Sequence, residues 1–114
     1  MKKNTDKIYE AYYDGLGSKF GEKVRRRIHW SCSNATGNEI LDIGCSQGIS
    51  SIILGREGKK VLGVDILEES IAFAGEKLKN EEAGTKELIE FLHANFMTYN
   101  FGEKKFDSIL LTEV

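Results

Sequence analysis

The stretch Leu41-Asp42-Ile43-Gly44-Cys45-Ser46-Gln47-Gly48 decides the fold of this chain. Residues 39–43 are a short run of mainly apolar side chains, two of them β-branched, which predicts a β-strand. From residue 46 to about residue 57 apolar side chains recur at helical spacing, and Gly58 stands where a helix commonly ends. The sequence therefore predicts a strand, a glycine-containing turn and a helix in direct succession.

Further strands and helices follow this unit in alternation. The predicted strands are residues 39–43, 60–64, 88–93 and 106–111, and the predicted helices between the first three are residues 46–57 and about 67–79. Residues 80–87 are polar and receive no element, and residues 95–105 are expected to form an irregular connection. Because the strands are almost continuously apolar, we expect a parallel sheet covered on both faces. The predicted fold class is α/β, a doubly wound parallel sheet.

Two helices are predicted ahead of the sheet, over residues 4–13 and 18–33, with glycines between them. No repeat, low-complexity tract or linker divides the chain. We therefore expect a single domain, with N-terminal helices over residues 1–35 and a β/α core over residues 36–114. Tyr12 and Tyr13 on the first helix are open to two interpretations, core packing or a lid over a ligand.

Composition excludes several classes of protein. The 114 residues carry 16 Lys and Arg against 18 Asp and Glu, a net charge of −2, which gives no general electrostatic case for binding nucleic acid or an anionic membrane. The basic run of residues 25–27 is interpreted as a solvated helix face. No apolar stretch approaches the ~20 residues of a membrane helix, and the N-terminus is polar, unlike a secretory signal.

The cysteines and histidines show no metal-binding spacing. Cys32 and Cys45 are thirteen positions apart, and His29 and His93 are isolated from each other. We expect no zinc site, no disulfide framework and a cytoplasmic location.

Ligands of open α/β sheets bind at the carboxyl ends of the strands. A dinucleotide site there requires G-x-G-x-x-G, but Ser46 and Ile49 stand where the second and third glycines would be. Asp42, two positions before the first glycine, would repel a pyrophosphate. A carboxylate at this place suits a ligand that carries an ammonium group and a positive sulfonium.

Four motifs, in order, resemble those of class I S-adenosylmethionine-dependent methyltransferases. They are residues 41–48, the sequence Gly63-Val64-Asp65, residues 89–96 and residues 106–114. The resemblance implies a Rossmann-like sheet in which the first four strands have the order 3-2-1-4. It also implies S-adenosylmethionine as the cofactor.

The resemblance assigns the methionine part of the cofactor to the first motif. The residues expected beside it are Asp42, Gly44, Cys45, Ser46 and Gly48. Glycines would let the backbone approach the cofactor closely, although both could also be ordinary glycines of a strand-to-helix turn. Ser46 replaces the usual middle glycine, where it could adjust the turn or cap the helix.

The other motifs would contact the ribose, the adenine and the reactive methyl group. Asp65 would accept hydrogen bonds from both ribose hydroxyls, because a carboxylate has two acceptor oxygens, although it could serve only as a helix cap. Ile66 would pack on the adenine face. Asn95, which replaces the usual Asp, would contact the adenine amino group beside Phe96, or would simply form a turn. Thr112 and Glu113 would line the floor near the methyl group.

The predicted function is the cofactor-binding half of a methyltransferase whose acceptor is an unidentified small molecule, lipid, glycan or protein. No residue can be assigned as a general base. The alternatives are a non-catalytic binding or assembly module on the same scaffold and an NAD-dependent oxidoreductase.

The chain ends at Val114, inside the fourth motif, so we expect an incomplete and inactive fragment. Its fourth strand would be an open sheet edge. We expect that edge to be covered by a second copy of the chain or by the N-terminal helices, or else to cause aggregation.

Overall fold

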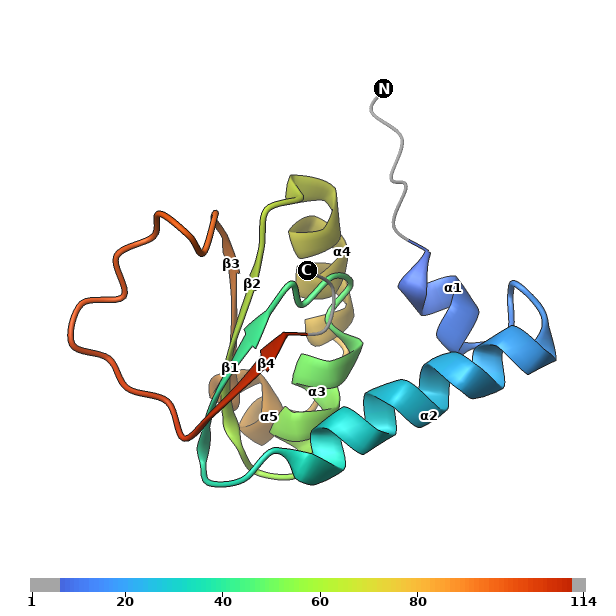
Figure 1. Cartoon of the computed structure of the whole chain (residues 1–114), viewed down its shortest axis with the longest axis horizontal. Helices are drawn as coiled ribbons and strands as arrows, with labels where there is room; N and C mark the ends of the chain where they lie inside the picture. Colours follow the sequence, from blue (N-terminus) through green and yellow to red (C-terminus); the bar gives the residue numbers. More distant parts are fainter. Residues whose placement is uncertain (1–6, 112–114) are drawn as a thin grey trace.

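The computed structural model describes residues 7–111 (Figure 1). In chain order the elements are α1 (Ile8–Tyr12), α2 (Ser18–Asn34), β1 (Glu39–Ile43), α3 (Ile49–Arg56), β2 (Lys60–Asp65), α4 (Glu68–Leu78), α5 (Ala83–Leu88), β3 (Ile89–His93) and β4 (Ser108–Leu111). No helix among these residues is long and apolar enough to cross a membrane.

The strands form one parallel sheet in the order β3-β2-β1-β4. The strand order and the parallel α/β class predicted from the sequence are both confirmed. The central strands β1 and β2 are buried from their second residue onward, whereas β4 alternates between half-buried and exposed positions. Continuous burial explains why the central strands read as apolar runs without alternation.

One face of the sheet is covered by helices, which lie together on one side in Figure 1. The core on this face joins buried side chains of three helices and three strands: Ala11, Val24, Ile28, Cys32, Ile52, Leu54, Ile40, Val61 and Ile89, with Leu88 of α5 partly buried at its margin. Helix α3 packs so closely on the sheet that a Cβ at Gly55 would collide with the Ile89 side chain.

The opposite face is covered by the long connection between β3 and β4. Phe96, Phe101 and Phe106 of this connection pack against a second buried cluster, which consists of Leu41, Ile43, Leu62 and Val64. The connection crosses the face away from the helices (Figure 1). The chain thus passes over both faces of the sheet, as a doubly wound fold requires, but an irregular loop occupies the second face.

Among the differences from the sequence-based expectations are two boundaries and one helix. Helix α3 begins at Ile49 after a left-handed Gly48 with φ 89°, so Ser46 lies in the turn and does not cap the helix. Strand β4 begins at Ser108, two residues later than predicted. The short helix α5 was not expected from its sequence.

Candidate functional site

The carboxyl ends of β1 and β2 lie side by side and are joined through the turn that follows β1. The amides of Gly44 and Cys45 both donate to the carbonyl of Val64, at 2.8 and 3.0 Å. The turn of the first motif is therefore hydrogen-bonded directly to the end of β2.

The carboxylate of Asp65 organises this junction. One oxygen, Oδ2, accepts a hydrogen bond from the Ser46 amide, and Oδ1 accepts one from the Leu67 amide, both at 2.8 Å. Asp65 is only 8% exposed. Each carboxylate oxygen can accept more than one hydrogen bond, so both remain capable of receiving a donor from a ligand. Asp65 also stands two residues before Leu67, the N-cap of α4, so it is not itself the helix cap.

The turn after β1 has a left-handed backbone at three positions: Gly44 (φ 70°), Ser46 (φ 55°) and Gly48 (φ 89°). Ser46 thus occupies a conformation that glycine adopts without strain. This explains why the related motif has glycine there, and it shows that serine fits the same turn.

A hollow of about 610 Å³ opens above these strand ends. Ser46, Asp65, Ile66 and Leu67 line it on the side of the core. The opposite wall comes from the N-terminal helices and the loop between them: Lys7, Ile8, Ala11, Leu16, Phe20, Val24 and Arg27. The sequence did not predict this wall, because an apolar stripe on a helix normally indicates side chains of the hydrophobic core. Leu16 and Phe20, however, are about half exposed and face the hollow.

Asp42 and Cys45 lie beneath the turn. Asp42 is completely buried and accepts a hydrogen bond from the Ser51 hydroxyl at 2.8 Å. It does not line the hollow at the strand ends, and its hydrogen bond to Ser51 supports the packing of α3 against the turn. Cys45 is 5% exposed and borders a small space next to Ser46.

The residues expected near the adenine occupy different surroundings. Ile66 is 62% exposed and lines the hollow. Asn95 lies outside the hollow and closes a turn, since its side-chain oxygen accepts from the Met97 amide at 3.0 Å. Phe96 packs in the apolar cluster beneath the β3–β4 connection. Thr112 and Glu113 lie outside the described residues.

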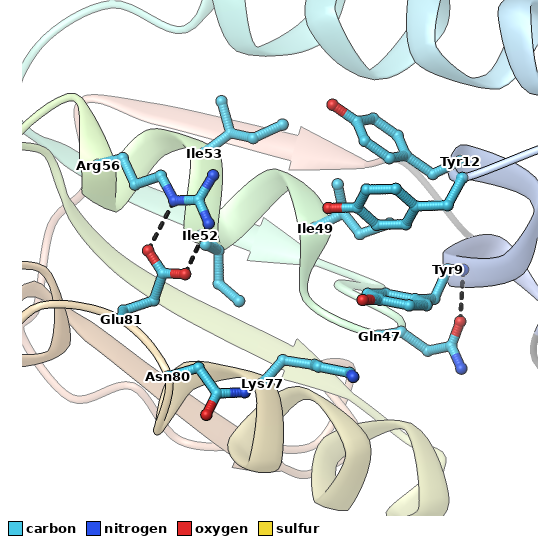
Figure 2. A pocket seen from close by; sticks show the side chains of 11 residues that line it. Tyr9, Tyr12, Gln47, Ile49, Ile52, Ile53, Arg56, Lys77, Asn80 and Glu81 are labelled. Carbon is cyan, nitrogen blue, oxygen red and sulfur yellow. Dashed lines mark hydrogen bonds and ion pairs between the residues drawn. The ribbon is translucent and has the colours of Figure 1, made fainter.

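Tyr12 and Tyr13 do not face this hollow. They line a separate cavity between α1, α3 and α4, shown in Figure 2. The Tyr12 hydroxyl is hydrogen-bonded to His29 Nε2 at 2.7 Å. The N-terminal helix α1 therefore separates two spaces, with Ile8 and Ala11 toward the hollow and its tyrosines toward the cavity.

No group of three or more metal-ligating side chains occurs in residues 7–111. Burial raises the pKa of the Cys32 thiol to about 12, which keeps it protonated at neutral pH.

Residues 40–114 match the family described as methyltransferase domain. The chain belongs to this family. Over 102 residues it is 31% identical to a protein of Geobacillus sp. (strain WCH70) that is named as a methyltransferase, a match that covers 90% of this chain and 37% of that protein. It is 33% identical over 93 residues to the ubiquinone biosynthesis O-methyltransferase of Aromatoleum aromaticum, covering 77% of this chain and 37% of that enzyme.

The chain thus spans little more than a third of the length of these relatives. Similar solved structures confirm the fold. Magnesium protoporphyrin IX methyltransferase from Synechocystis, solved with bound S-adenosylmethionine, has a TM-score of 0.62 at 22% identity, over 96% of this chain and 50% of that one. The [4+2]-cyclase SpnF has a TM-score of 0.68 at 17% identity, over 79% of this chain and 34% of the cyclase.

Proposed function

We propose that this chain is the cofactor-binding part of an S-adenosylmethionine-dependent methyltransferase that acts on a small molecule, lipid, glycan or protein. Family membership supports the reaction class. The solved methyltransferase with bound S-adenosylmethionine supports the choice of cofactor. Because the relatives are much longer, the proposal places residues 1–114 within a larger domain, with N-terminal helices over 1–35 and the β/α core beyond them.

The observation that carries the proposal is the position of the Asp65 carboxylate. Backbone amides of Ser46 and Leu67 hold its two oxygens in place at the mouth of the hollow. A carboxylate fixed in this way can accept two neighbouring ribose hydroxyls, and such charge-assisted hydrogen bonds are strong. The hollow of about 610 Å³ is also within the usual range for small-molecule sites.

The remaining contacts follow from the same geometry. The left-handed turn from Gly44 to Gly48 would lie against the methionine part, since a backbone without Cβ atoms can be approached closely. Ile66, exposed in the hollow, would pack on the adenine. Asn95, Phe96, Thr112 and Glu113 stay as proposed neighbours of the adenine and the methyl group.

The bound cofactor would supply an already activated methyl group on its sulfonium. The protein's contribution is then mainly to bind and orient, and a general base is needed only where the acceptor must lose a proton. We assign no residue between Lys7 and Leu111 to that role.

Substitution of Asp65 tests the proposal. By calorimetry, Asp65→Ala should weaken S-adenosylmethionine binding by about tenfold or more, the loss expected for charge-assisted hydrogen bonds. Asp107→Ala is the matched control, because Asp107 also accepts two backbone amides but lies before β4, at the opposite end of the sheet. It should change the affinity by less than about twofold. Unaltered binding by Asp65→Ala, or equal losses in the two variants, would refute the assignment.

The second interpretation is a non-catalytic binding or assembly module on the same scaffold. Incubating the longer protein with S-adenosylmethionine labelled in its methyl group distinguishes the two. Transfer to an acceptor excludes the non-catalytic module. An NAD-dependent oxidoreductase is disfavoured by Ser46 and Ile49 at the required glycine positions and by the family match.

We also propose a cytoplasmic location for the protein. The small number and wide spacing of its cysteines, both free in the structure, support a reducing compartment. Fractionation of cells that produce the protein tests this location.

A further inference from the structure

The cavity between α1, α3 and α4 is a second space, of about 230 Å³, and it is partly open to solvent. It lies on the opposite side of α1 from the hollow at the strand ends, and the two spaces share no lining residue. None of the cofactor contacts proposed above falls in it. We call it the tyrosine cavity, after Tyr9, Tyr12 and Tyr13 in its wall.

The walls of the tyrosine cavity suit a flat apolar group. Isoleucines 49, 52 and 53 of α3 form one side, and Tyr9 and Tyr12 of α1 face Arg56 and Glu81 across the space (Figure 2). Aromatic rings pack favourably on other rings and on aliphatic side chains. Drug-sized ligands occupy pockets of about 300 Å³ or more, so this smaller space would hold a single ring with small substituents.

The polar lining carries an excess of positive charge. Arg56 and Lys77 are its cations and Glu81 is its carboxylate. The Arg56 guanidinium forms an ion pair with Glu81 and donates two hydrogen bonds of 2.6 Å to its carboxylate. Lys77 has no such partner among residues 7–111: its ammonium lies 4.6 Å from the centroid of the Tyr9 ring and 5.2 Å from that of Phe73. A half-buried lysine whose ammonium lies over two rings and forms no ion pair within residues 7–111 favours an added anion.

Gln47 supplies a further donor. It is 2% exposed, lines the cavity, and accepts a hydrogen bond from the Tyr9 amide at 2.6 Å through its side-chain oxygen. Its side-chain nitrogen makes no hydrogen bond to the described residues. An amide donor of a residue at the cavity wall is suited to an acceptor oxygen of a ligand.

We propose that the tyrosine cavity binds a small aromatic carboxylate. The ring lies between the tyrosines and the isoleucines. The carboxylate accepts hydrogen bonds from the Lys77 ammonium and from the Gln47 side-chain nitrogen. Because Gln47 belongs to the turn after β1 and accepts from the Tyr9 amide, the occupant contacts a residue that connects this turn to α1. The proposal does not depend on methyl transfer.

Titration of the 114-residue chain with 4-hydroxybenzoate tests the proposal. Followed by amide NMR, the probe should bind saturably and shift the signals of Tyr9 and Gln47. The uncharged analogue 4-hydroxybenzamide and the Lys77→Gln variant should each reduce the affinity by about tenfold, as expected for one charge-assisted hydrogen bond. Lys79→Gln is the matched control, because Lys79 is on the same helix but pairs with Glu76 outside the cavity.

Lys77 also covers the Tyr9 ring, so the fold of Lys77→Gln is checked by thermal unfolding. Tyr13→Ala provides a second variant: Tyr13 is 61% exposed, so its truncation removes a ring from the cavity wall without opening the core. It should also weaken binding. Absence of saturable binding to the unaltered chain, binding that survives both variants, or an equal loss in Lys79→Gln would each overturn the proposal.

Discussion

Ser46 and Gly48 both have a left-handed backbone, but only position 46 carries a side chain. Serine is accommodated there at a φ of 55°. At Gly48 the φ is 89°, and an added Cβ would also lie 2.8 Å from the Cβ of Ala74 and 2.8 Å from Phe91 Cζ. Glycine is therefore required at position 48 by the backbone and by packing together.

Gly48→Ala should destabilise the protein by about 2–4 kcal/mol, the sum of a left-handed backbone penalty and overpacking. Gly58→Ala is the matched control, since Gly58 has φ 90° and nothing within 4 Å of an added Cβ. It should cost only about 1–2 kcal/mol, the backbone penalty alone. Urea unfolding measures both. Equal losses in the two variants would show that the contact of Gly48 with Ala74 and Phe91 is unimportant.

Among single residues, the sequence predicted those whose position depends only on their neighbours along the chain. Asp65 and the turn glycines follow from their places after strands, and they lie where the two strand ends meet. Gln47 could not be predicted, because its hydrogen bond to Tyr9 joins residues 38 positions apart and depends on how α1 packs. Asn95 had two interpretations, and the observed turn depends on a bond to Met97, two residues away.

The elements predicted well were those with strong periodicity. Strand β1 has the predicted bounds, α2 begins at the predicted residue, and α4 lies within the predicted range of about 67–79. Helix α5 was missed because its six residues include Gly84 and none of them is buried. Its contacts with α3 and β3 stabilise it, so tertiary packing overrides a weak local preference.

Asp107 connects the segment before β4 to the start of β1. Its Oδ2 accepts from the amides of Asn38 and Glu39 at 2.8 and 2.9 Å, and these hydrogen bonds, first that of Glu39, lower the pKa of the carboxyl. The Asp107 amide in turn donates to the Glu39 carbonyl at 2.7 Å. Side-chain and backbone hydrogen bonds of Asp107 thus join the segment before β4 to the start of β1.

Asp107→Ala should lower the melting temperature at neutral pH. A carboxyl whose folded pKa is depressed contributes stability above its unfolded pKa and loses that contribution as the pH falls through the folded value. The difference between the unaltered chain and the variant should therefore shrink in acid, below the ordinary Asp value of 3.8. Asp107→Asn keeps an acceptor oxygen without the charge and should show no such pH dependence. A difference that stays constant across this pH range would contradict the role of the charge.

At the scale of the whole molecule, β4 is the last strand of the sheet within residues 7–111. Among these residues it pairs only with β1, and Ile109 and Leu111 are 56% and 62% exposed. Trp30 of α2, 68% exposed, borders a hollow of about 520 Å³ together with β4. The N-terminal helices therefore leave these β4 side chains accessible, and of the two coverings expected for this edge a second copy of the chain is the one we propose.

The 114-residue chain should therefore self-associate through β4. An exposed, apolar edge strand offers unpaired amides and carbonyls to another copy, and a lysine on such an edge prevents pairing. In analytical ultracentrifugation the unaltered chain should sediment as a dimer or larger species, and Ile109→Lys as a monomer. Met97→Lys is the matched control, because Met97 is 76% exposed on the β3–β4 connection and receives the same charge away from the edge. It should associate like the unaltered chain. A monomeric unaltered chain at high concentration, or identical behaviour of the two lysine variants, would rule out association through β4.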